Sequence, residues 1–554
     1  MNSLDLIVIL VYFVGIVIYG LWISRNIKTS EGYFMGGRKF KWWTMMGQAF
    51  GTGTHAEMPV AQTGACFQLG FATIWYQWKN MLITPFYWLI APWYRRSNCV
   101  TTGEMVALRY GRAMGLVFAI FAILFLVFTM GTMLQGAAKV ISVASNNAIT
   151  PNVVVITMTL AFMIYSFFGG LTAAAHTEFI QGVLIVILSF MLIPLGLREV
   201  GGFTEMRSSL PEDFFSLYND SSGLGAFTIA MLAVNGVVGI TAQPHMMSVM
   251  GTGNTEIACR VGQTYGTFVK RFVTIGWALT GLIVATMVIQ NNITLEDPEF
   301  AFGYAARVLL APGLTGLLVA CILAANMSTC SNFMVGAGAL FTRDIYAVYL
   351  DPKVSDKKQK RLGQISGLAL TACSVLFALT ITNVLSAFLF LETISAFMGI
   401  IIFGGVIWKR ANRYGAAAAV ITSFALYYLL NFQEIGELRL IYRWTPEPFG
   451  WAILVGFISL IVVSLLTKKE PSETADAFFD RLEHLAPKDR EEGQNPLAKD
   501  VGKDLILYDA ATWFTKDRWT NFWTRYKDDL GGFLLAWLMV GFLILVAWLL
   551  MQIH

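Results

Sequence analysis

Long apolar stretches, repeated along the chain, constrain this sequence more than any other feature. About fourteen segments have the length of mostly apolar residues that an α-helix needs to cross the hydrocarbon core of a bilayer. Because lipid offers no hydrogen-bond partner to a peptide group, such segments must be helical. With 56% hydrophobic and 13% charged residues among 554, the composition excludes a water-soluble domain of this length. The sequence predicts an all-α polytopic membrane protein.

The predicted spans are separated by short polar loops, except before the last span. They cover residues 4–24, 42–68, 71–94, 113–142, 151–170, 171–197, 225–250, 267–291, 313–342, 364–384, 386–408, 414–432, 449–467 and 531–552. Residues 468–530 are the one long polar segment, interpreted as a solvated linker with a candidate amphipathic piece near 505–527. This segment is too short for a kinase or nucleotide-binding domain, so we interpret it as a tether for the last helix.

Lys and Arg are distributed unevenly between alternate loops, which predicts the orientation of the chain. If the N-terminus is external, the short internal loops hold 21 Lys and Arg, and the external loops hold five. The internal loops in this count are 25–41, 94–112, 251–271, 343–363 and 409–413. The bias predicts a multi-pass protein of a bacterial-type inner (plasma) membrane, with both termini external and the 468–530 loop cytoplasmic. Topology thus explains the net charge of +4 better than nucleic-acid binding does.

Two predicted spans contain helix-breaking residues at mid-membrane depth. Span 42–68 holds the run from Gly51 to Pro59, and span 225–250 holds the run from Asn235 to His245. Unwound backbone is tolerated inside a membrane only where it lines a cavity, and its carbonyls and helix ends can then bind ions or charged solute groups. Both runs are therefore candidate binding segments.

The two interrupted spans lie five helices apart, and this spacing predicts an internal repeat. Because five is odd, the second five-helix unit must enter from the opposite face, giving inverted repeats with a broken first helix in each. The predicted division of the chain is 1–41 for an extra N-terminal helix and internal loop, 42–197 for the first repeat, 225–408 for the second repeat, 409–467 for two peripheral helices, 468–530 for a cytoplasmic loop and 531–554 for the C-terminal helix.

Span 313–342 contains a cluster of small hydroxyl residues that follows Ala325, with Ser328 and Thr329 adjacent to each other. Close helix packing is one explanation, because Ser and Thr are common where helices meet in a membrane. A sodium site is the other. Neighbouring hydroxyls and a carbonyl one turn earlier supply three oxygen ligands, and carbonyls of an unwound helix can complete the shell. The run alone leaves both explanations open.

Several motifs occur in a fixed order within residues 4–410. They are Gly37-Arg38 with Trp42-Trp43, Tyr76-Gln77-Trp78, Phe168-Gly169-Gly170-Leu171, Thr177-Glu178-Phe179-Ile180-Gln181, Gln243-Pro244-His245, Ala325 to Thr329, and Leu340 to Tyr346 with Arg343-Asp344. Taken together they resemble the sodium:solute symporter family, which includes the sodium/glucose cotransporters and bacterial proline permease. The resemblance implies about fourteen transmembrane helices on a leucine-transporter-type core, with Na⁺ as the coupling ion.

The resemblance also implies ion-binding residues. The shared sodium site would use backbone oxygens of Gly51, Thr54 and Ala325 with the hydroxyls of Ser328 and Thr329. Glu178 stands where the family often has Asp, at a position where a further cation can be handled. It is a candidate for a second cation or a proton, and a structural carboxylate near the internal mouth is the alternative.

The family's solute pocket lies between the broken helices and the third span. In this chain that position implies Glu57, Gln62, Gln77, Asn80, Asn235 and Gln243, with Lys79 as a further candidate. Gln77 and Asn80 match positions that contact sugar in the bacterial sodium/galactose transporter, where other residue types occur. This departure favours a solute other than a sugar.

Lys79 is an ionisable group within a predicted span, which is unfavourable unless the group is paired or solvated. Glu57 is its expected partner. A Lys79–Glu57 pair would hold the pocket together, whereas a Lys79 that faces the cavity would bind a carboxylate. Glu392 and Lys139 lie nearer the span ends and are expected to reach the interface by snorkelling.

These features predict sodium-coupled symport of a small organic solute by alternating access between the two faces of the membrane. A carboxylate or an amino-acid-like zwitterion is the leading solute class, and a sugar or polyol is next. The alternatives are a proton-coupled transporter that uses Glu178 or Glu57, and a membrane sensor that signals through the 468–530 loop. No enzyme activity or nucleic-acid partner is expected. The expected partners are the solute and the lipid bilayer, and the protein is expected to be a monomer.

Overall fold

The computed structural model describes residues 3–25, 29–52, 54–55, 57–146, 149–219, 223–486 and 504–553. Within these residues the chain forms helices joined by connecting segments. The β-type pairing of the described part amounts to two isolated bridges, Phe40 with Gly253 and Asn219 with Leu224. The all-helical class predicted from the sequence is confirmed.

The helices of the first part of the chain are α1 (Ser3–Ser24), α2 (Ser30–Met35), η1 (Gly36–Arg38), α3 (Trp42–Thr52), α4 (Glu57–Leu69), η2 (Phe71–Ile74), α5 (Trp75–Ser97), α6 (Thr102–Tyr110), α7 (Arg112–Ala144) and α8 (Pro151–Val200). They are followed by α9 (Phe203–Ser209), η3 (Glu212–Phe215), α10 (Ala226–Gly239), η4 (Ile240–Ala242), α11 (Met246–Gly251), α12 (Glu256–Gln290), η5 (Pro298–Phe300) and α13 (Ala301–Leu309).

The remaining helices are α14 (Leu314–Ala339), a π-helix η6 (Leu340–Leu350), α15 (Asp356–Ala378), α16 (Val384–Ile407), α17 (Arg413–Ile435), α18 (Pro446–Leu466), α19 (Ser472–Glu483), η7 (Ala510–Phe514), α21 (Lys516–Trp519), α22 (Phe522–Arg525) and α23 (Lys527–Leu550). In the described part of the chain, nine helical segments are long and apolar enough to cross a membrane, and three shorter apolar helices accompany them. A multi-pass protein is therefore confirmed, whereas the count of fourteen spans stays a prediction.

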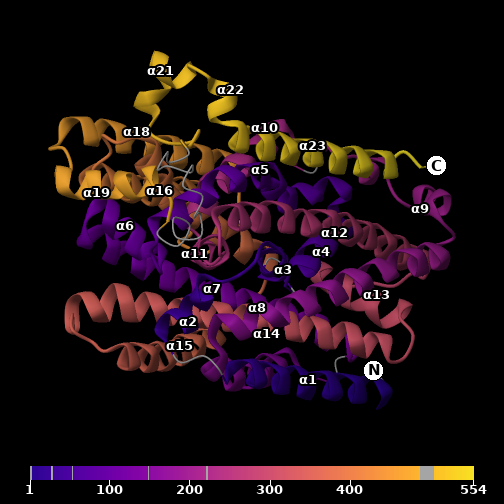
Figure 1. Ribbon diagram of the computed structural model, residues 1–554. Helices are drawn as coiled ribbons and strands as arrows, with labels where there is room; N and C mark the ends of the chain where they lie inside the picture. The colour runs from indigo at the N-terminus through magenta and orange to yellow at the C-terminus, as the bar shows by residue number, and fades with distance from the viewer. Residues whose placement is uncertain are drawn as a thin grey trace.

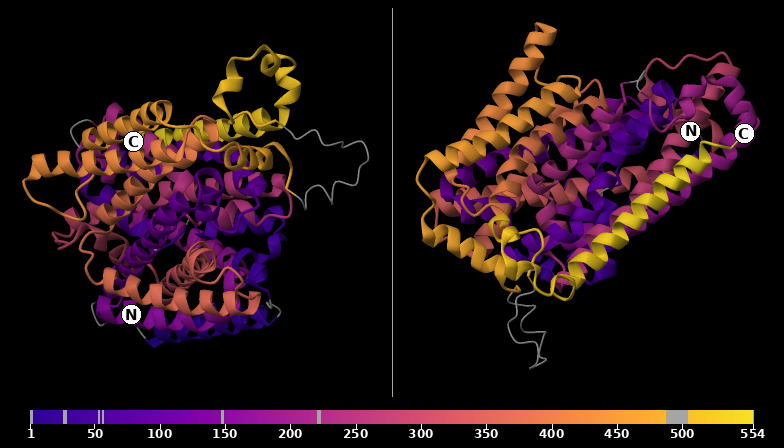
Figure 2. Two further views of the ribbon diagram at one scale, coloured as in Figure 1. Left: turned by 90° about the vertical axis from the view of Figure 1, so that its left-hand side faces the viewer. Right: turned by 90° about the horizontal axis from the view of Figure 1, so that it is seen from above.

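The long helices lie side by side in one bundle, and both described ends of the chain lie at the same end of it (Figure 1). In the left view of Figure 2, the N-terminal and C-terminal helices lie on opposite sides of the bundle. Termini at one end agree with an even number of crossings.

α8 covers two of the predicted spans, 151–170 and 171–197. Arg307, near the end of α13, donates a hydrogen bond to Asn146, which lies just before α8, and Leu309 of α13 packs against Gly196 near the other end of α8. A straight helix of 50 residues would separate these two ends by about 75 Å. Since one short helix contacts both ends, the chain reverses direction within α8, as two separate spans require.

Both predicted helix interruptions are confirmed. The first lies between α3 and α4, where residues 54–55 are described as non-helical. The second lies between η4 and α11 at Gln243 to His245. Pro244 has no backbone N–H to donate, and its ring disfavours a helical conformation at the preceding residue, which explains why the helix stops there.

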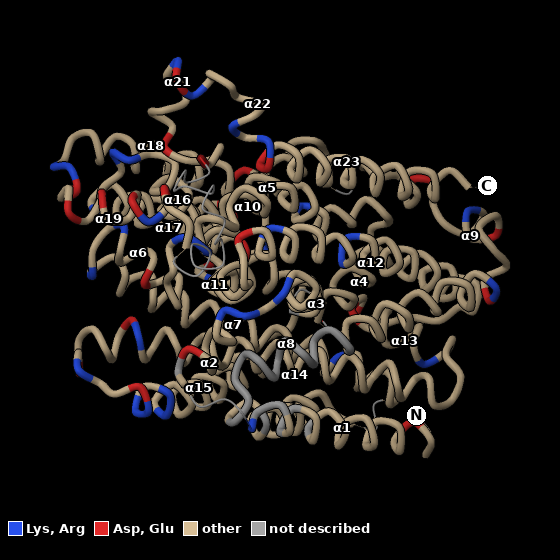
Figure 3. Tube along the Cα trace, viewed as in Figure 1, with Lys and Arg blue, Asp and Glu red and all other residues tan. Residues whose placement is uncertain are grey.

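Charged residues lie mainly toward the two ends of the bundle, and coloured segments within α12 lie between those ends (Figure 3). The prediction that residues 251–271 form a loop is wrong, because α12 begins at Glu256 and runs for 35 residues. Arg260, Lys270 and Arg271, counted above as loop cations, are buried side chains of this helix. The loops that set the predicted orientation therefore carry fewer cations than the sequence suggested.

The described part of the 468–530 segment is not an extended tether. α19 packs against α5 and α6, and Arg481 of α19 donates to the carbonyl of Ser97. Trp93 of α5 donates its indole N–H to the carbonyl of Leu507 at 3.0 Å. The segment therefore lies against the helical bundle on both sides of residues 487–503.

Candidate functional site

Short local turns close the two helix interruptions. After α3, the Thr54 amide donates to the Gly51 carbonyl at 3.0 Å, and the Thr54 hydroxyl donates to the Phe50 carbonyl at 2.7 Å. In the second interruption, the Met246 amide donates to the Gln243 carbonyl at 3.0 Å. These bonds fix backbone that is not part of a continuous helix, so side chains between the helices can turn into the space beside them.

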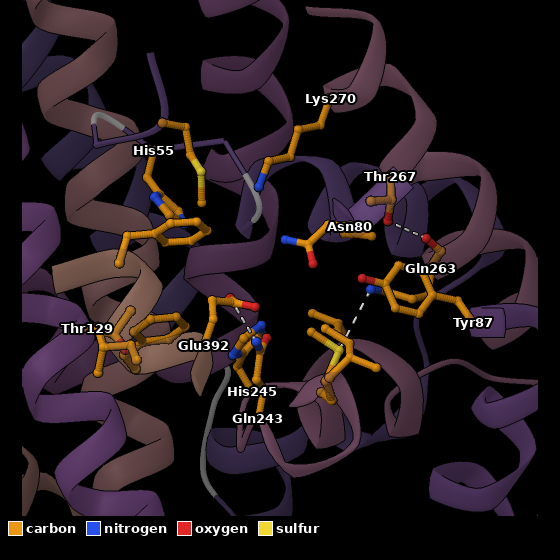
Figure 4. A pocket seen from close by; sticks show the side chains of 18 of the residues that line it. His55, Asn80, Tyr87, Thr129, Gln243, His245, Gln263, Thr267, Lys270 and Glu392 are labelled. Carbon is orange, nitrogen blue, oxygen red and sulfur yellow. Dashed lines mark hydrogen bonds between the residues drawn. The ribbon is translucent and has the colours of Figure 1, made fainter. Parts of the chain in front are cut away.

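A polar cavity of about 80 Å³ lies where the two interruptions meet α5, α12 and α16. Figure 4 shows that Lys270 and Asn80 point into its open centre, facing Glu392, Gln243 and His245 on the other side. Its polar and charged lining consists of His55, Glu57, Asn80, Tyr87, Thr129, Gln243, His245, Gln263, Thr267, Lys270, Arg271 and Glu392. Of the predicted solute residues, Glu57, Asn80 and Gln243 therefore line this cavity.

Lys79 and Asn235 lie behind the cavity wall in one chain of polar contacts. Lys79 Nζ donates to Asn235 Oδ1 at 2.8 Å and pairs with Glu392 Oε2 at 3.4 Å. Glu392 Oε1 in turn accepts a hydrogen bond from Gln243 Nε2 at 2.9 Å. The expected partner of Lys79 was wrong, because its carboxylate partner is Glu392 of α16 rather than Glu57. Lys79 is fully buried in this pair, as expected for a structural ion pair.

Glu392 does not reach the interface as expected, because it is buried within α16. Lys139 is also buried, and it pairs with Asp297 at 2.7 Å and with Glu299. Glu299 accepts hydrogen bonds from the Val384 and Leu385 amides at the start of α16. Snorkelling was therefore wrong for both residues, because partners from distant segments satisfy them inside the protein.

Glu57 begins α4, and its carboxylate contacts the imidazole Nδ1 of His55, which also lines the cavity. Its other carboxylate oxygen, Oε2, is buried without a hydrogen-bond partner in the described part of the chain. A Cβ at Gly136 would lie 2.7 Å from the Glu57 Cα, so only glycine allows α7 to approach the start of α4 this closely. The backbone of α7 thus helps to position Glu57.

Gln62 and Gln77 do not line the cavity, although both are buried. The amide nitrogen and oxygen of each side chain lack hydrogen-bond partners among the described residues. Buried polar groups are normally satisfied by protein or water. The two side chains are therefore groups that water or a ligand would have to satisfy, one α4 turn and one α5 turn away from the cavity.

Sequence reasoning missed Lys270 and Arg271, which line the cavity from α12. Lys270 has no ion-pair or hydrogen-bond partner among the residues that the structure describes, and Arg271 Nε and Nη1 likewise have none. The sequence signal that would have located these two residues is the start of α12. Thr255 caps α12 by accepting a hydrogen bond from the Ala258 amide, and a Thr before an acidic residue is a helix-start pattern.

The candidate sodium ligands of α14 converge on one carbonyl. The Ser328 hydroxyl donates to the Ala325 carbonyl at 2.9 Å, and the Thr329 hydroxyl donates to the same oxygen at 3.1 Å. All three residues are buried, and α14 packs against α3, which ends next to Thr54. Rotation of the two hydroxyl hydrogens would present three oxygens to a hard cation, so the chemistry of this group fits Na⁺.

The side chain of Glu178 lies outside the described residues, as do those of the motif Phe168 to Leu171. In the described part of the chain, no group of three or more His, Cys, Asp and Glu side chains could hold a metal ion. The sodium candidates are therefore the hydroxyl and carbonyl oxygens named above.

Sequence comparison identifies a family model and several transporters to which this chain is similar. The model of the sodium:solute symporter family matches residues 33–423. The chain is 24% identical to the osmoregulated proline transporter OpuE of Bacillus subtilis (strain 168), over 87% of this chain and 99% of that protein. It is also 24% identical to sodium/glucose cotransporter 1 of Oryctolagus cuniculus, over 85% of this chain and 80% of that protein.

Among solved structures, the fold is similar to that of a Na⁺-coupled sialic acid symporter in a substrate-bound outward-open state, with a TM-score of 0.71. The match covers 84% of this chain and 99% of the other, at 17% sequence identity. At this identity the likeness concerns the fold alone.

Proposed function

The chain belongs to the sodium:solute symporter family, and we propose that it carries a small organic solute with a carboxylate group, an acid or an amino-acid-like zwitterion, across the membrane together with sodium. Members of this family are transporters and not enzymes, and sodium is their coupling ion. The solute class is the step beyond family membership.

One observation carries the proposal: the two helix interruptions contribute to one cavity that is rich in unsatisfied polar groups. Glu57 Oε2, Asn80 Oδ1 and His245 Nδ1 are buried in its wall without partners among the described residues. Unmet buried polar groups are unfavourable in a purely structural role, whereas a polar solute would satisfy them. The unwound backbone beside them suits alternating access, in which the two repeats rock around a central site.

For sodium, we propose a site formed by the backbone oxygens of Gly51, Thr54 and Ala325 and the hydroxyls of Ser328 and Thr329. The convergence of both hydroxyls on the Ala325 carbonyl supports the α14 half of the site. Binding there would hold the end of α3 against α14, and the end of α3 leads into His55 and Glu57 of the cavity. Sodium would thereby organise the solute site, with Glu178 as a candidate for a second cation or a proton.

The orientation follows the loop charges that remain after the correction of α12. Both termini are external in this proposal, and the 468–530 segment is cytoplasmic. Cysteine-free protein with one cysteine introduced near each terminus would test this, because a membrane-impermeant thiol reagent labels external positions in intact cells.

A binding assay on purified protein in detergent tests the function directly. The melting temperature is measured with small solutes in sodium chloride and in potassium chloride at equal ionic strength, because a ligand of the folded state raises it. A solute that stabilises the protein only in sodium supports coupled symport, and uptake into proteoliposomes with and without a sodium gradient then tests transport. Stabilisation that ignores sodium but follows pH contradicts the proposal and favours proton coupling.

A further inference from the structure

The cavity has an unusual balance of charge. Among the described side chains, three cations lie in it or directly behind its wall, Lys79, Lys270 and Arg271, against two carboxylates, Glu57 and Glu392. One positive charge is therefore left uncompensated when the two histidines are neutral. Sodium bound at the neighbouring site raises the excess to two.

The excess charge is located on α12. Lys79 is matched by Glu392, and Glu57 is engaged by His55. Lys270 makes no ion pair in the described part of the chain, and its ammonium group points into the cavity in Figure 4. Arg271 contacts the Tyr87 hydroxyl, but its Nε and Nη1 have no hydrogen-bond partners among the described residues, and no carboxylate there pairs with it.

Leaving these groups unpaired is energetically unfavourable. A buried charge without a partner in a membrane protein is strongly disfavoured, and such residues mark binding sites or ion pathways. Lys270 is only 5% exposed and Arg271 only 2% exposed, so water replaces little of the missing interaction. A ligand that brings negative charge would relieve both groups at once.

We propose that the solute is an organic anion whose carboxylate binds between Lys270 and Arg271, and that neutral zwitterions and sugars are poor solutes. This inference rests on the proposed function and narrows it. A monoanion neutralises the empty cavity, and an anion with two charges neutralises the cavity with sodium bound, whereas a zwitterion leaves the whole excess in place.

The remaining polar groups fit an anion that also carries hydroxyl or carbonyl oxygen. Glu57 Oε2 can accept a hydroxyl hydrogen as well as an ammonium hydrogen, and the Asn80 amide both donates and accepts. Glu57 alone would favour a zwitterion. The one uncompensated positive charge of the cavity decides for an anion, because net charge, rather than one acceptor, sets the cost of burying the complex.

The test uses purified full-length protein and three pools of solutes with two to six carbons. The acid pool holds acetate, lactate, pyruvate, succinate and citrate; the zwitterion pool holds glycine, alanine and proline; the neutral pool holds lactamide, glycerol and glucose. Melting temperatures are measured in sodium and in potassium. The acid pool is expected to raise the melting temperature by about 3 °C or more in sodium, and the other pools are not.

Three variants locate the effect. Lys270→Gln is expected to weaken binding of the active acid about tenfold or more, since it removes a charge-assisted hydrogen bond. Lys270→Arg keeps the charge and is expected to retain most of the binding. Lys357→Gln removes the same charge from an exposed position and is the matched control, with binding unchanged.

Each outcome of these measurements supports or overturns the inference that the solute is an organic anion. If the zwitterion or neutral pool stabilises the protein in sodium as much as the acid pool does, or without it, the inference is overturned and the proposed function stands. If Lys270→Gln folds and keeps wild-type affinity for the acid, the inference is also overturned. If no pool acts in sodium, both fail for solutes of this size. The pools test wild-type protein, so the inference remains testable even if Lys270→Gln does not fold.

Discussion

Helix α12 carries two groups of buried charged side chains, and the groups differ in whether they have ion-pair partners. Near its start, Arg260 pairs with Glu256 at 3.0 Å and with Asp529 of α23 at 2.6 Å, and Glu256 also binds Arg96 of α5 at 2.7 Å. Ten residues after Arg260, Lys270 and Arg271 line the cavity without ion-pair partners in the described part of the chain.

The difference separates structural charges from candidate ligand-binding charges on a single helix. Both groups are similarly buried, so burial alone does not distinguish them. The two groups are distinguished by their ion-pair partners. The first group joins α5, α12 and α23 at one end of the bundle. The second group is available to a ligand that is not part of the chain. Substitutions at the two ends of α12 test this contrast.

Arg260→Met is expected to destabilise the protein by about 3–5 kcal/mol, because it leaves the Asp529 carboxylate buried without its cation. The melting temperature of the purified protein, or its yield where too little folds, measures this effect.

The double variant Arg260→Met with Asp529→Leu is the control, since it removes both charges and leaves Glu256 with Arg96. It is expected to recover much of the loss. A single variant as stable as wild type would show that the paired end of α12 contributes no more than the cavity end, and the contrast would fail.

Lys79→Met is expected to lower stability by about 2–3 kcal/mol, because Glu392 and Asn235 lose their buried donor. Adding Glu392→Gln should restore most of the stability. Lys79 borders the cavity but is paired, so it sharpens the comparison with Lys270. If Lys79→Met instead folded normally and lost solute binding, Lys79 would belong with the ligand-binding charges.

The features that the sequence predicted well are those with a local signature. Apolar length located the long helices, and the glycine-rich run after Gly51 and the Gln243-Pro244-His245 turn located both interruptions. The family resemblance implied Glu57, Asn80 and Gln243 as solute residues, and these three line one cavity in the structure.

Pairing between distant segments has no such signature. Lys79 and Glu392 are 313 residues apart, so nothing near Lys79 in the sequence indicated its partner, and the nearer Glu57 was chosen instead. The cavity position of Lys270 was lost for a different reason. The apolar run starts after α12 does, so the predicted span begins only at residue 267, and Lys270 and Arg271 near its start are counted among the cations of the loop 251–271.

Thr329→Ala is expected to weaken sodium binding about tenfold, because it removes one of roughly five oxygen ligands from a hard cation. The sodium concentration needed for half of the solute-induced rise in melting temperature measures it. Ser374→Ala in α15 is the matched control, since that buried hydroxyl also donates to a carbonyl one turn earlier. Unchanged sodium dependence in both Thr329→Ala and Ser328→Ala would remove α14 from the sodium site.

Lys270→Met is expected to have the smallest effect on the ligand-free protein: stability unchanged, or higher by up to about 1 kcal/mol. Replacing an unpaired buried ammonium by an apolar side chain removes an unfavourable burial, whereas replacing a paired one breaks an interaction. Lys139→Met is the matched control, since Lys139 is similarly buried but binds Asp297 and Glu299, and it should destabilise the protein clearly. A large loss of ligand-free stability in Lys270→Met would mean that its charge is satisfied within the chain, and the distinction between the two ends of α12 would no longer hold.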